Sequence, residues 1–245
     1  MSMIQQSTTP ISRDRGLPIA ETFHSLQGEG TYVGTPMHFI RLAGCPVGKK
    51  ASFDFGGMQH DGYHLPILSN GVMQSMCQTW DGRFFPCDTD FSCHTYKTVD
   101  ELIGETWEKH ICLTGGEPLI HQQSLISSGF FQQVFAKHIQ IHIETSGTVL
   151  LHQALQHDKR VWVTISPKWN CLALMYSFAD EVKFLVDENW DESKLEFSTS
   201  AQIYVSPING EKTVNQENVQ RCLKLLEHHP AWRLSCQWHK FLGLR

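Results

Sequence analysis

Short runs of apolar and β-branched residues recur along this chain and predict strands. They cover residues 38–42, 110–114, 139–145, 161–165, 181–186, 202–205 and 232–236. Between them, apolar positions return at helical spacing and predict helices over residues 99–109, 125–138, 150–157 and 215–228. Thr98 stands directly before the first of these helices, and Glu101 three residues later completes a capping box, which marks a helix start.

Strands that alternate with helices are typical of an α/β fold with mostly parallel strands, either an open sheet or a partial (β/α) barrel. In such folds the loops after the carboxyl ends of the strands carry the functional residues. Five of the predicted strands run into polar loops, at residues 44–45, 115–118, 146–147, 166–168 and 206–209. We therefore expect these loops to share one rim and to form a single site above the sheet.

Length and composition favour one ordinary globular domain over residues 1–245. Only 18% of the residues are charged, the net charge is −5 and no basic stripe occurs, so nucleic acid is not an expected partner. No segment approaches the roughly 18 apolar residues of a membrane span, and residues 1–15 lack the apolar core of a secretion signal. The expected location is the cytoplasm, without contact to a membrane.

Two stretches fall outside the periodic pattern. Residues 1–20 form a polar N-terminal extension. Residues 48–76 are rich in glycine, aperiodic and long, which is typical of an inserted loop.

Eight cysteines in a chain without an export signal are expected to stay reduced, because the cytosol disfavours disulfides. Cys112, Cys222 and Cys236 lie in apolar or periodic segments, and we expect them to act as small buried hydrophobes. In polar loops, where a metal site is more natural than a core, lie Cys45, Cys77, Cys87 and Cys93.

The candidate chemistry comes from three stretches in order: Cys45 after a strand, Cys87 beside an acid, and Gly-Gly-Glu-Pro at 115–118. Three thiolates can hold three irons of a [4Fe–4S] cluster and leave the fourth iron open. Radical S-adenosylmethionine (SAM) chemistry needs such an open iron, because SAM binds to it before an electron from the cluster breaks a carbon–sulfur bond. Gly115 and Gly116 have no Cβ and would let the backbone approach the methionyl amine closely.

Seven blocks, in order from residue 21 to the end, carry a more specific likeness. They are ETFHSLQGEG at 21–30, RLAGC at 41–45, CDT at 87–89, TGGEP at 114–118, ETSG at 144–147, SPK at 166–168 and QWHK at 237–240. Together they resemble the 7-carboxy-7-deazaguanine synthases, a family of radical SAM lyases with a partial (β/α) barrel of radical-SAM type.

The resemblance implies contraction of 6-carboxy-5,6,7,8-tetrahydropterin to 7-carboxy-7-deazaguanine with loss of ammonia, on the route to queuosine and related deazapurines. It implies three cofactors, namely a [4Fe–4S] cluster, SAM and Mg²⁺, with SAM regenerated. It also implies a homodimer and an electron donor such as flavodoxin.

The implied substrate contacts lie in the first block, on the strands and at the C-terminus. Glu29 offers a carboxylate to the amino-pyrimidinone donors of the pterin, and the planar fork of Arg41 suits a substrate oxygen or carboxylate. These two side chains could instead pair with each other as a structural ion pair. The implied set is Leu26, Gln27, Gly28, Glu29, Arg41, Thr114, Glu144, His239 and Arg245.

The implied SAM contacts lie around the last cluster cysteine and in the loops of the rim. Thr89 resembles the family's Mg²⁺ ligand, and a hydroxyl oxygen suits that hard cation. No catalytic residue beyond the cluster is implied. The SAM contacts are Pro86, Asp88, Gly115, Gly116, Glu117, Ser146, Ser166, Lys168, Ser206 and Asn209.

The cysteine spacing departs from the family's usual Cys-x3-Cys-x2-Cys, because the middle ligand is missing from its place. Cys77 precedes Cys87 with nine residues between them, and Asp81-Gly82 in that interval is a hairpin-turn signal. Such a turn would fold Cys77 back beside Cys87, so we expect Cys45, Cys77 and Cys87 to hold the cluster. Residues 48–76 then form an insertion between the first two ligands. The competing middle ligands are Cys93 and, more remotely, His94.

Two other functions compete with this hypothesis. A radical SAM activase would use the same cluster to install a glycyl radical on a partner protein, but it would not explain Gln27, Glu29 or Arg41. A non-catalytic protein could instead bind Zn²⁺ in a closed tetrahedral site. The ligands of that site would be Cys45, Cys77, Cys87 and Cys93.

Overall fold

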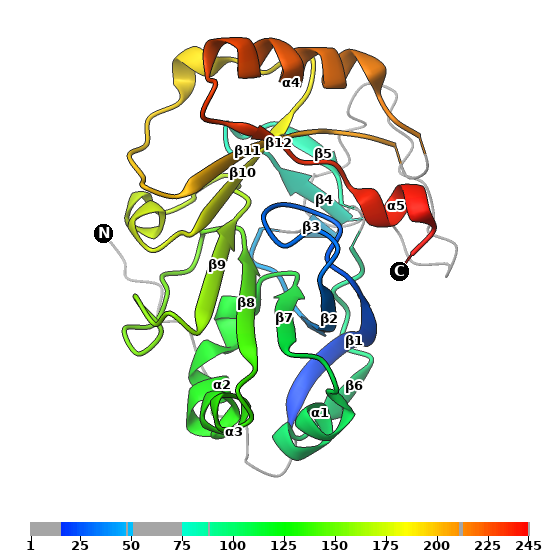
Figure 1. Cartoon of the computed structure of the whole chain (residues 1–245), viewed down its shortest axis with the longest axis vertical. Coiled ribbons are helices and arrows are strands. Elements are labelled where there is room, and N and C mark those ends of the chain that lie inside the picture. The colour runs from blue at the N-terminus through cyan, green and yellow to red at the C-terminus, as the bar shows by residue number, and fades with distance from the viewer. Residues whose placement is uncertain (1–15, 48, 51–74, 88, 211–212, 245) are drawn as a thin grey trace.

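The computed structural model describes residues 16–47, 49–50, 75–87, 89–210 and 213–244. Within them, nine strands form one sheet in the order β12-β11-β10-β9-β8-β7-β2-β1-β6, and three form a small sheet in the order β3-β4-β5 (Figure 1). The large sheet contains β1 (Leu17–Leu26), β2 (Pro36–Leu42), β6 (Thr95–Lys97), β7 (His110–Gly115), β8 (Gln140–Thr145), β9 (Val161–Ile165), β10 (Glu181–Val186), β11 (Gln202–Pro207) and β12 (Arg233–Leu234). The small sheet contains β3 (Lys49–Lys50), β4 (Ser75–Gln78) and β5 (Phe84–Pro86).

Helices fill the connections between the strands. The α-helices are α1 (Val99–Glu105), α2 (Gln122–Ser127), α3 (Phe130–Ala136), α4 (Gln216–His228) and α5 (Trp238–Leu242). Three short 3₁₀ helices are η1 (Pro118–His121), η2 (Ala173–Ser177) and η3 (Glu192–Lys194). Figure 1 places α1, α2 and α3 at one end of the molecule and α4 at the other.

Neighbouring strands run parallel from β2 through β7, β8, β9, β10 and β11 to β12, whereas β1 pairs antiparallel with both β2 and β6. The strand order has two ends, so the sheet does not close on itself. The prediction of a mostly parallel α/β partial barrel is confirmed.

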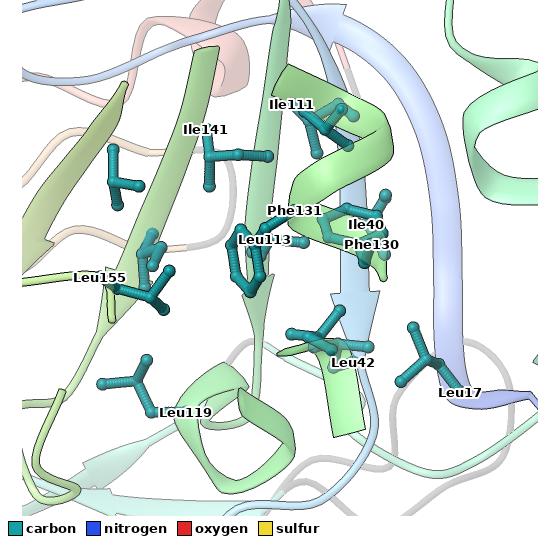
Figure 2. Close-up of a cluster of buried hydrophobic side chains, with 14 of the residues drawn as sticks. Leu17, Ile40, Leu42, Ile111, Leu113, Leu119, Phe130, Phe131, Ile141 and Leu155 are labelled. Carbon is teal, nitrogen blue, oxygen red and sulfur yellow. The ribbon is translucent and has the colours of Figure 1, made fainter. Parts of the chain in front are cut away.

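Alternation along the parallel strands separates an apolar face from a polar one. In β8, Ile141 and Ile143 belong to the main core, whereas His142 and Glu144 between and after them face the opposite side. Figure 2 shows this core between the sheet and the helices, with Leu113 beside Phe130 and Phe131. Each such side chain stabilises the fold by roughly 1.5–3 kcal/mol when it is fully buried.

A second core lies beneath α4. The side chain of Asn215 accepts a hydrogen bond from the backbone N–H of Asn218 at 3.0 Å and caps this helix. Cys222 packs there with Val186 and Val205 of β10 and β11. Burial raises the pKa of the Cys222 thiol to about 12 and raises that of Cys112. Both are therefore buried hydrophobes as predicted, whereas Cys236 is only half-buried.

Three helix predictions were wrong in extent or existence. The helix expected over residues 125–138 is two helices, because Gly129 adopts a left-handed φ of 80° between them. The helix expected over 99–109 ends at Glu105, where Thr106 turns to an extended conformation. Residues 150–157 form turns rather than a helix.

Several elements have no counterpart among the predictions, namely β1, β3 to β6 and α5. Residues 17–20, assigned to the N-terminal extension, begin β1, and the two ends of the expected insertion form β3 and the start of β4. The remainder of both segments, at residues 1–15, 48 and 51–74, lies outside the described residues. In the described part of the chain, no helix has the length and apolar character needed to cross a membrane.

Candidate functional site

The polar face of the large sheet carries inward side chains that come from neighbouring strands. Gln27, just after β1, donates from Nε2 to Oε1 of Glu144 on β8 at 2.9 Å. Thr114 on β7 donates from its hydroxyl to Oε2 of the same carboxylate at 3.4 Å. Three of the predicted substrate residues are therefore brought together, and Glu144 is the acceptor that joins them.

The segment between β1 and β2 crosses this polar face from β8 to β11 (dark blue in Figure 1). Glu29 forms an ion pair with Lys183 of β10. The backbone N–H of Thr31 donates to Oε2 of Glu181 at 2.9 Å, and the Thr31 hydroxyl lies 3.2 Å from that of Tyr204. Residues 27–35 thus lie over the inner face of the sheet.

A pocket opens between this segment and the strands. Its polar groups include three carboxylates and one ammonium, so it is suited to a small polar ligand rather than to an apolar one. It is lined by Gln27, Glu29, Tyr32, His142, Glu144, Trp162, Thr164, Glu181 and Lys183.

Burial sets the ionisation of several groups around this pocket. It raises the pKa of Glu181 and lowers that of Lys183 to about 8. It also lowers the pKa of His142 to about 3, and His110, whose Nδ1 lies 2.9 Å from Nε2 of His142, adds to that effect. The Tyr32 ring packs edge-on against His142 with centroids 4.4 Å apart. His142 is therefore an uncharged, packed group at neutral pH.

The C-terminal block at residues 237–240 contacts the first block at Gly28. The backbone N–H of Trp238 donates to the carbonyl of Gly28 at 3.0 Å. A Cβ on Gly28 would lie only 2.1 Å from Nδ1 of His239, so only glycine leaves room for that ring. The two blocks, more than 200 residues apart in the sequence, are thus in contact. Arg245 lies outside the described residues.

Glu29 and Arg41 do not pair with each other. Nε of Arg41 donates to Oε1 of Glu21 at 2.9 Å, across the β1–β2 pair, and its NH1 reaches the carbonyl of Gly115 at 3.4 Å. The alternative of a Glu29–Arg41 ion pair was wrong, because Lys183 takes the Glu29 carboxylate. Arg41 instead connects the strands to the glycine loop.

The rim predicted from the strand ends brings the first two functional loops into contact. The backbone N–H of Glu117 donates to the carbonyl of Gly44 at 3.0 Å. A Cβ on Gly116 would lie 2.2 Å from that carbonyl oxygen and 2.6 Å from Cβ of Cys45. Cys45 therefore lies directly against the Gly-Gly-Glu-Pro loop.

Glu117 joins this loop to the one after β8. Its carboxylate accepts from the backbone N–H groups of Leu119 and Ser146, at 3.0 and 2.8 Å, and from the hydroxyls of Thr145, at 2.8 Å, and Ser146. The side chain is fully buried, which raises its pKa. Its visible role is to hold two loops in register, and contact with a cofactor stays a prediction.

Replacing Glu117 with glutamine is expected to lower the free energy of unfolding by about 2–4 kcal/mol. The amide replaces one acceptor oxygen with an NH2 group, which would then face the hydrogen-bond donors that the carboxylate accepts from. Urea unfolding at neutral pH measures this loss. The exposed Glu227→Gln on α4 is the matched control. Equal midpoints for the two variants would contradict the structural role.

The remaining SAM candidates lie in loops after β9 and β11. Nζ of Lys168 donates to the hydroxyl of Ser166 at 2.7 Å. Ser206 is buried at the end of β11, and Oδ1 of Asn209 accepts from the backbone N–H of Asn215 at 2.9 Å. These loops follow the carboxyl ends of their strands, as predicted.

The hairpin predicted from Asp81-Gly82 is confirmed. In the β4–β5 pair, Cys77 lies opposite Phe85. Cys87 directly follows the last residue of β5, so the two cysteines belong to the two arms of one hairpin. Cys77 is buried, with 7% of its surface exposed.

The hairpin is fastened to the rim. Thr79 pairs with Lys168 in an isolated antiparallel bridge, and a Cβ on Gly82 would touch the ring of Trp169 at 2.8 Å. Arg83 donates to both oxygens of Asp187, which directly follows β10, at 2.5 Å. The β4–β5 hairpin therefore packs on the loops after β9 and β10.

The other metal candidates lie farther along the same loop. Cys93 is exposed, and Nε2 of His94 lies 2.9 Å from Oδ2 of Asp90. The thiol of Cys87 reaches the carbonyl of Thr89 at 3.8 Å, whereas Asp88 lies outside the described residues and nothing is described of the Pro86 side chain. Among the described residues, no three His, Cys, Asp or Glu side chains already stand at metal-binding distances.

Six pocket residues were missing from the predicted site, namely Tyr32, His142, Trp162, Thr164, Glu181 and Lys183. The two on β10 were detectable, because Glu181 and Lys183 are charges at alternate positions of a strand whose other residues are apolar. Such charges face either solvent or a site, and only the structure shows which.

Comparisons with known proteins find relatives over nearly the whole chain. No protein-family model matches the chain. It is 32% identical to the 7-carboxy-7-deazaguanine synthase of Synechocystis over 238 residues, which cover 93% of both chains. It is 28% identical to the synthase of Escherichia coli K12, over 93% of this chain and 98% of that protein.

A solved structure gives the same result. The crystal structure of QueE from Escherichia coli superposes with a TM-score of 0.60 at 27% identity, and the match covers 91% of this chain and 94% of that one. The resemblance seen in the seven sequence blocks is thereby confirmed. The chain belongs to the 7-carboxy-7-deazaguanine synthases, a family of radical SAM enzymes.

Proposed function

We propose that this protein contracts 6-carboxy-5,6,7,8-tetrahydropterin to 7-carboxy-7-deazaguanine with loss of ammonia, in the biosynthesis of queuosine and related deazapurines. The observation that carries this proposal is the 32% identity to a 7-carboxy-7-deazaguanine synthase over 93% of both chains. The polar pocket is compatible with it, because carboxylates and a glutamine suit the hydrogen-bond donors of a pterin ring.

We further propose that Cys45, Cys77 and Cys87 hold a [4Fe–4S] cluster with one open iron. The contact of Cys45 with Gly116 and the β4–β5 register of Cys77 support this set. When bound, the cluster supplies the electron that cleaves SAM. In this proposal the protein supplies the thiols of Cys45, Cys77 and Cys87 as ligands at the rim.

SAM is proposed to bind along that rim. Gly115 and Gly116 pack closely against residues 42–45, where a Cβ would clash, so their backbone lies next to Cys45. Ser166 and Lys168 follow β9, and Ser206 and Asn209 lie at the end of β11 and just after it, on the same edge of the sheet, which supports contacts to one ligand. Pro86, Asp88, Glu117 and Ser146 remain proposed contacts on the family resemblance.

Substrate is proposed to bind beneath SAM, in the pocket. Thr89 is the proposed Mg²⁺ ligand, and a single domain, a homodimer and an electron donor such as flavodoxin are proposed from family membership alone. The proposed substrate contacts are Leu26, Gln27, Gly28, Glu29, Arg41, Thr114, Glu144, His239 and Arg245.

The test is anaerobic reconstitution with iron and sulfide, followed by incubation with SAM, reductant, Mg²⁺ and the carboxypterin. We expect 7-carboxy-7-deazaguanine, ammonia and turnover of SAM without its net loss. SAM cleavage to 5′-deoxyadenosine without the deazaguanine would point to another substrate. A reconstituted protein without iron would contradict the cluster itself.

Replacing Arg41 with alanine is expected to lower kcat/KM for the pterin about 100-fold, because a charged, planar donor is lost from the wall of the site. Steady-state kinetics with each substrate varied in turn separate the pterin from SAM. The exposed Arg160→Ala is the control. If only the KM for SAM changes, Arg41 acts on the glycine loop through Gly115 and not on the pterin.

A further inference from the structure

Lys183 is a buried cation in the middle of the pocket. It lies on β10, with 9% of its side chain exposed, and forms an ion pair with Oε2 of Glu29. A lysine ammonium is costly to bury without a partner and is seldom placed in this way for stability alone. The inference below rests on the proposed function, because it concerns how the same pocket recognises its ligand.

The charged groups that surround Lys183 in the pocket are all acidic. Glu29 and Tyr32 face it from the segment 27–35, Glu144 and His142 from β8, and Glu181 from its own strand. The uncharged Trp162 and Thr164 of β9 complete the lining. His142 stays neutral, so three carboxylates share the pocket with one ammonium. Among the described lining residues, Lys183 is the only lysine or arginine.

Carboxylates crowded together raise one another's pKa values, and burial adds to the effect. Without a cation, Glu29 would tend to take up a proton beside Glu144 and Glu181. A protonated carboxyl is a donor on one oxygen, and it would then meet the N–H donors of an amino-pyrimidinone edge with the wrong polarity. The ammonium of Lys183 prevents this.

The ion pair also leaves part of Glu29 available. Lys183 contacts Oε2, and no other donor to this carboxylate is found among the described residues. The second oxygen can therefore accept from a ligand. Gln27, whose Oε1 accepts from the backbone N–H of Glu29 at 3.2 Å, holds the same residue from the other side.

We propose that Lys183 is a positioning residue for substrate recognition, which keeps Glu29 ionised and oriented to accept hydrogen bonds from the donor edge of a flat, amino-pyrimidinone-type ring. It acts through Glu29 and does not touch the ligand. The proposal makes the effects of the two residues interdependent.

The experiment measures binding of 6-carboxypterin, a stable and fluorescent relative of the proposed substrate, to the reconstituted enzyme without reductant. The variants are Lys183→Met, Glu29→Gln and the double variant, with the exposed Lys159→Met as control. At pH 7.5 each single variant is expected to weaken binding about 10- to 100-fold. In the Glu29→Gln background, Lys183→Met is expected to change binding by less than about threefold, because the two act as one unit.

A pH series provides a readout that a merely structural role would not change. In Lys183→Met, binding should strengthen as the pH rises from 6.5 to 8.5, because Glu29 then ionises without its cation. In the unmodified enzyme, binding should not strengthen over this range. Burial lowers the pKa of Lys183 to about 8, so the positive charge is lost rather than gained as the pH rises.

If the double variant weakens binding by the product of the two single effects, the proposal is overturned, since Lys183 would then contact the ligand independently of Glu29. Unchanged binding in Lys183→Met would overturn it as well. If that variant does not fold, Lys183→Gln combined with Glu29→Gln removes one charge of each sign, leaves the net charge of the pocket unchanged and gives the same comparison. Binding of 6-carboxypterin without formation of the deazaguanine by the unmodified enzyme would contradict the proposed function alone.

Discussion

Replacing Cys77 with alanine is expected to leave the reconstituted protein without a stable iron–sulfur cluster and to reduce SAM cleavage to background. Two thiolates cannot hold a [4Fe–4S] cluster that needs three protein ligands to leave one iron open. Cys77 lies on β4 and Cys87 directly follows β5, so both belong to one hairpin, and the Cys77 side chain is buried. Iron content, visible absorbance and 5′-deoxyadenosine formation measure the loss.

Cys93→Ala is the matched control, because Cys93 is the competing ligand on the same loop. Its thiol is exposed and contacts the carbonyl of Thr95 at 3.4 Å, at the start of β6. We expect this variant to keep the cluster and most of its activity. A cluster that survives Cys77→Ala and disappears in Cys93→Ala would exchange the two assignments.

The parallel strands could be predicted because each contains a short run rich in apolar and β-branched residues. The runs at 161–165 and 181–186 match β9 and β10 residue for residue. The antiparallel strand β1 was not predicted from the sequence. Its second half, from Glu21 to Leu26, consists of half-buried and exposed residues and belongs to the first family block. A strand at the open side of a sheet does not need an apolar run.

The site was predictable where it follows strand ends and unpredictable where it depends on partners. The contact between the loops of Cys45 and Gly116 follows from the parallel order of β2 and β7. The pairing of Glu29 with Lys183 does not, because 154 residues separate them and two other carboxylates could have taken the lysine. Which charged side chains pair depends on the folded structure, and the sequence shows only which residues could pair.

The β4–β5 hairpin shows which features a local sequence signal can predict and which it cannot. Asp81-Gly82 predicted the turn, and Thr79 and Arg83 close it with a hydrogen bond of 2.8 Å between their backbones. Nothing local predicted that Arg83 would reach Asp187 beyond β10. The position of this hairpin therefore depends on a contact with the rim that no motif encodes.

Gly116→Ala is expected to remove both the cluster and SAM binding, although it adds a single methyl group. That methyl carbon would lie 2.2 Å from the carbonyl oxygen of Gly44 and 2.6 Å from Cβ of Cys45, distances that real Cβ atoms do not show. Both neighbours are backbone or next to it, so neither can rotate away. The loop that carries Gly44 and Cys45 must therefore move away from the loop that carries Gly116. This movement breaks the hydrogen bond from Glu117 to Gly44 and displaces Cys45.

The control for this variant is Gly104→Ala in α1, where an added Cβ meets nothing within 4 Å. That substitution should stabilise the helix by roughly 0.5–1 kcal/mol and leave the rim unchanged. Gly116→Ala should lower the free energy of unfolding by about 1–3 kcal/mol, as overpacking does. Iron content and equilibrium binding of SAM are measured beside urea unfolding. Since the cluster and SAM are proposed to meet at Gly116, both should be lost together, and a variant that binds SAM with normal affinity would place SAM elsewhere on the rim.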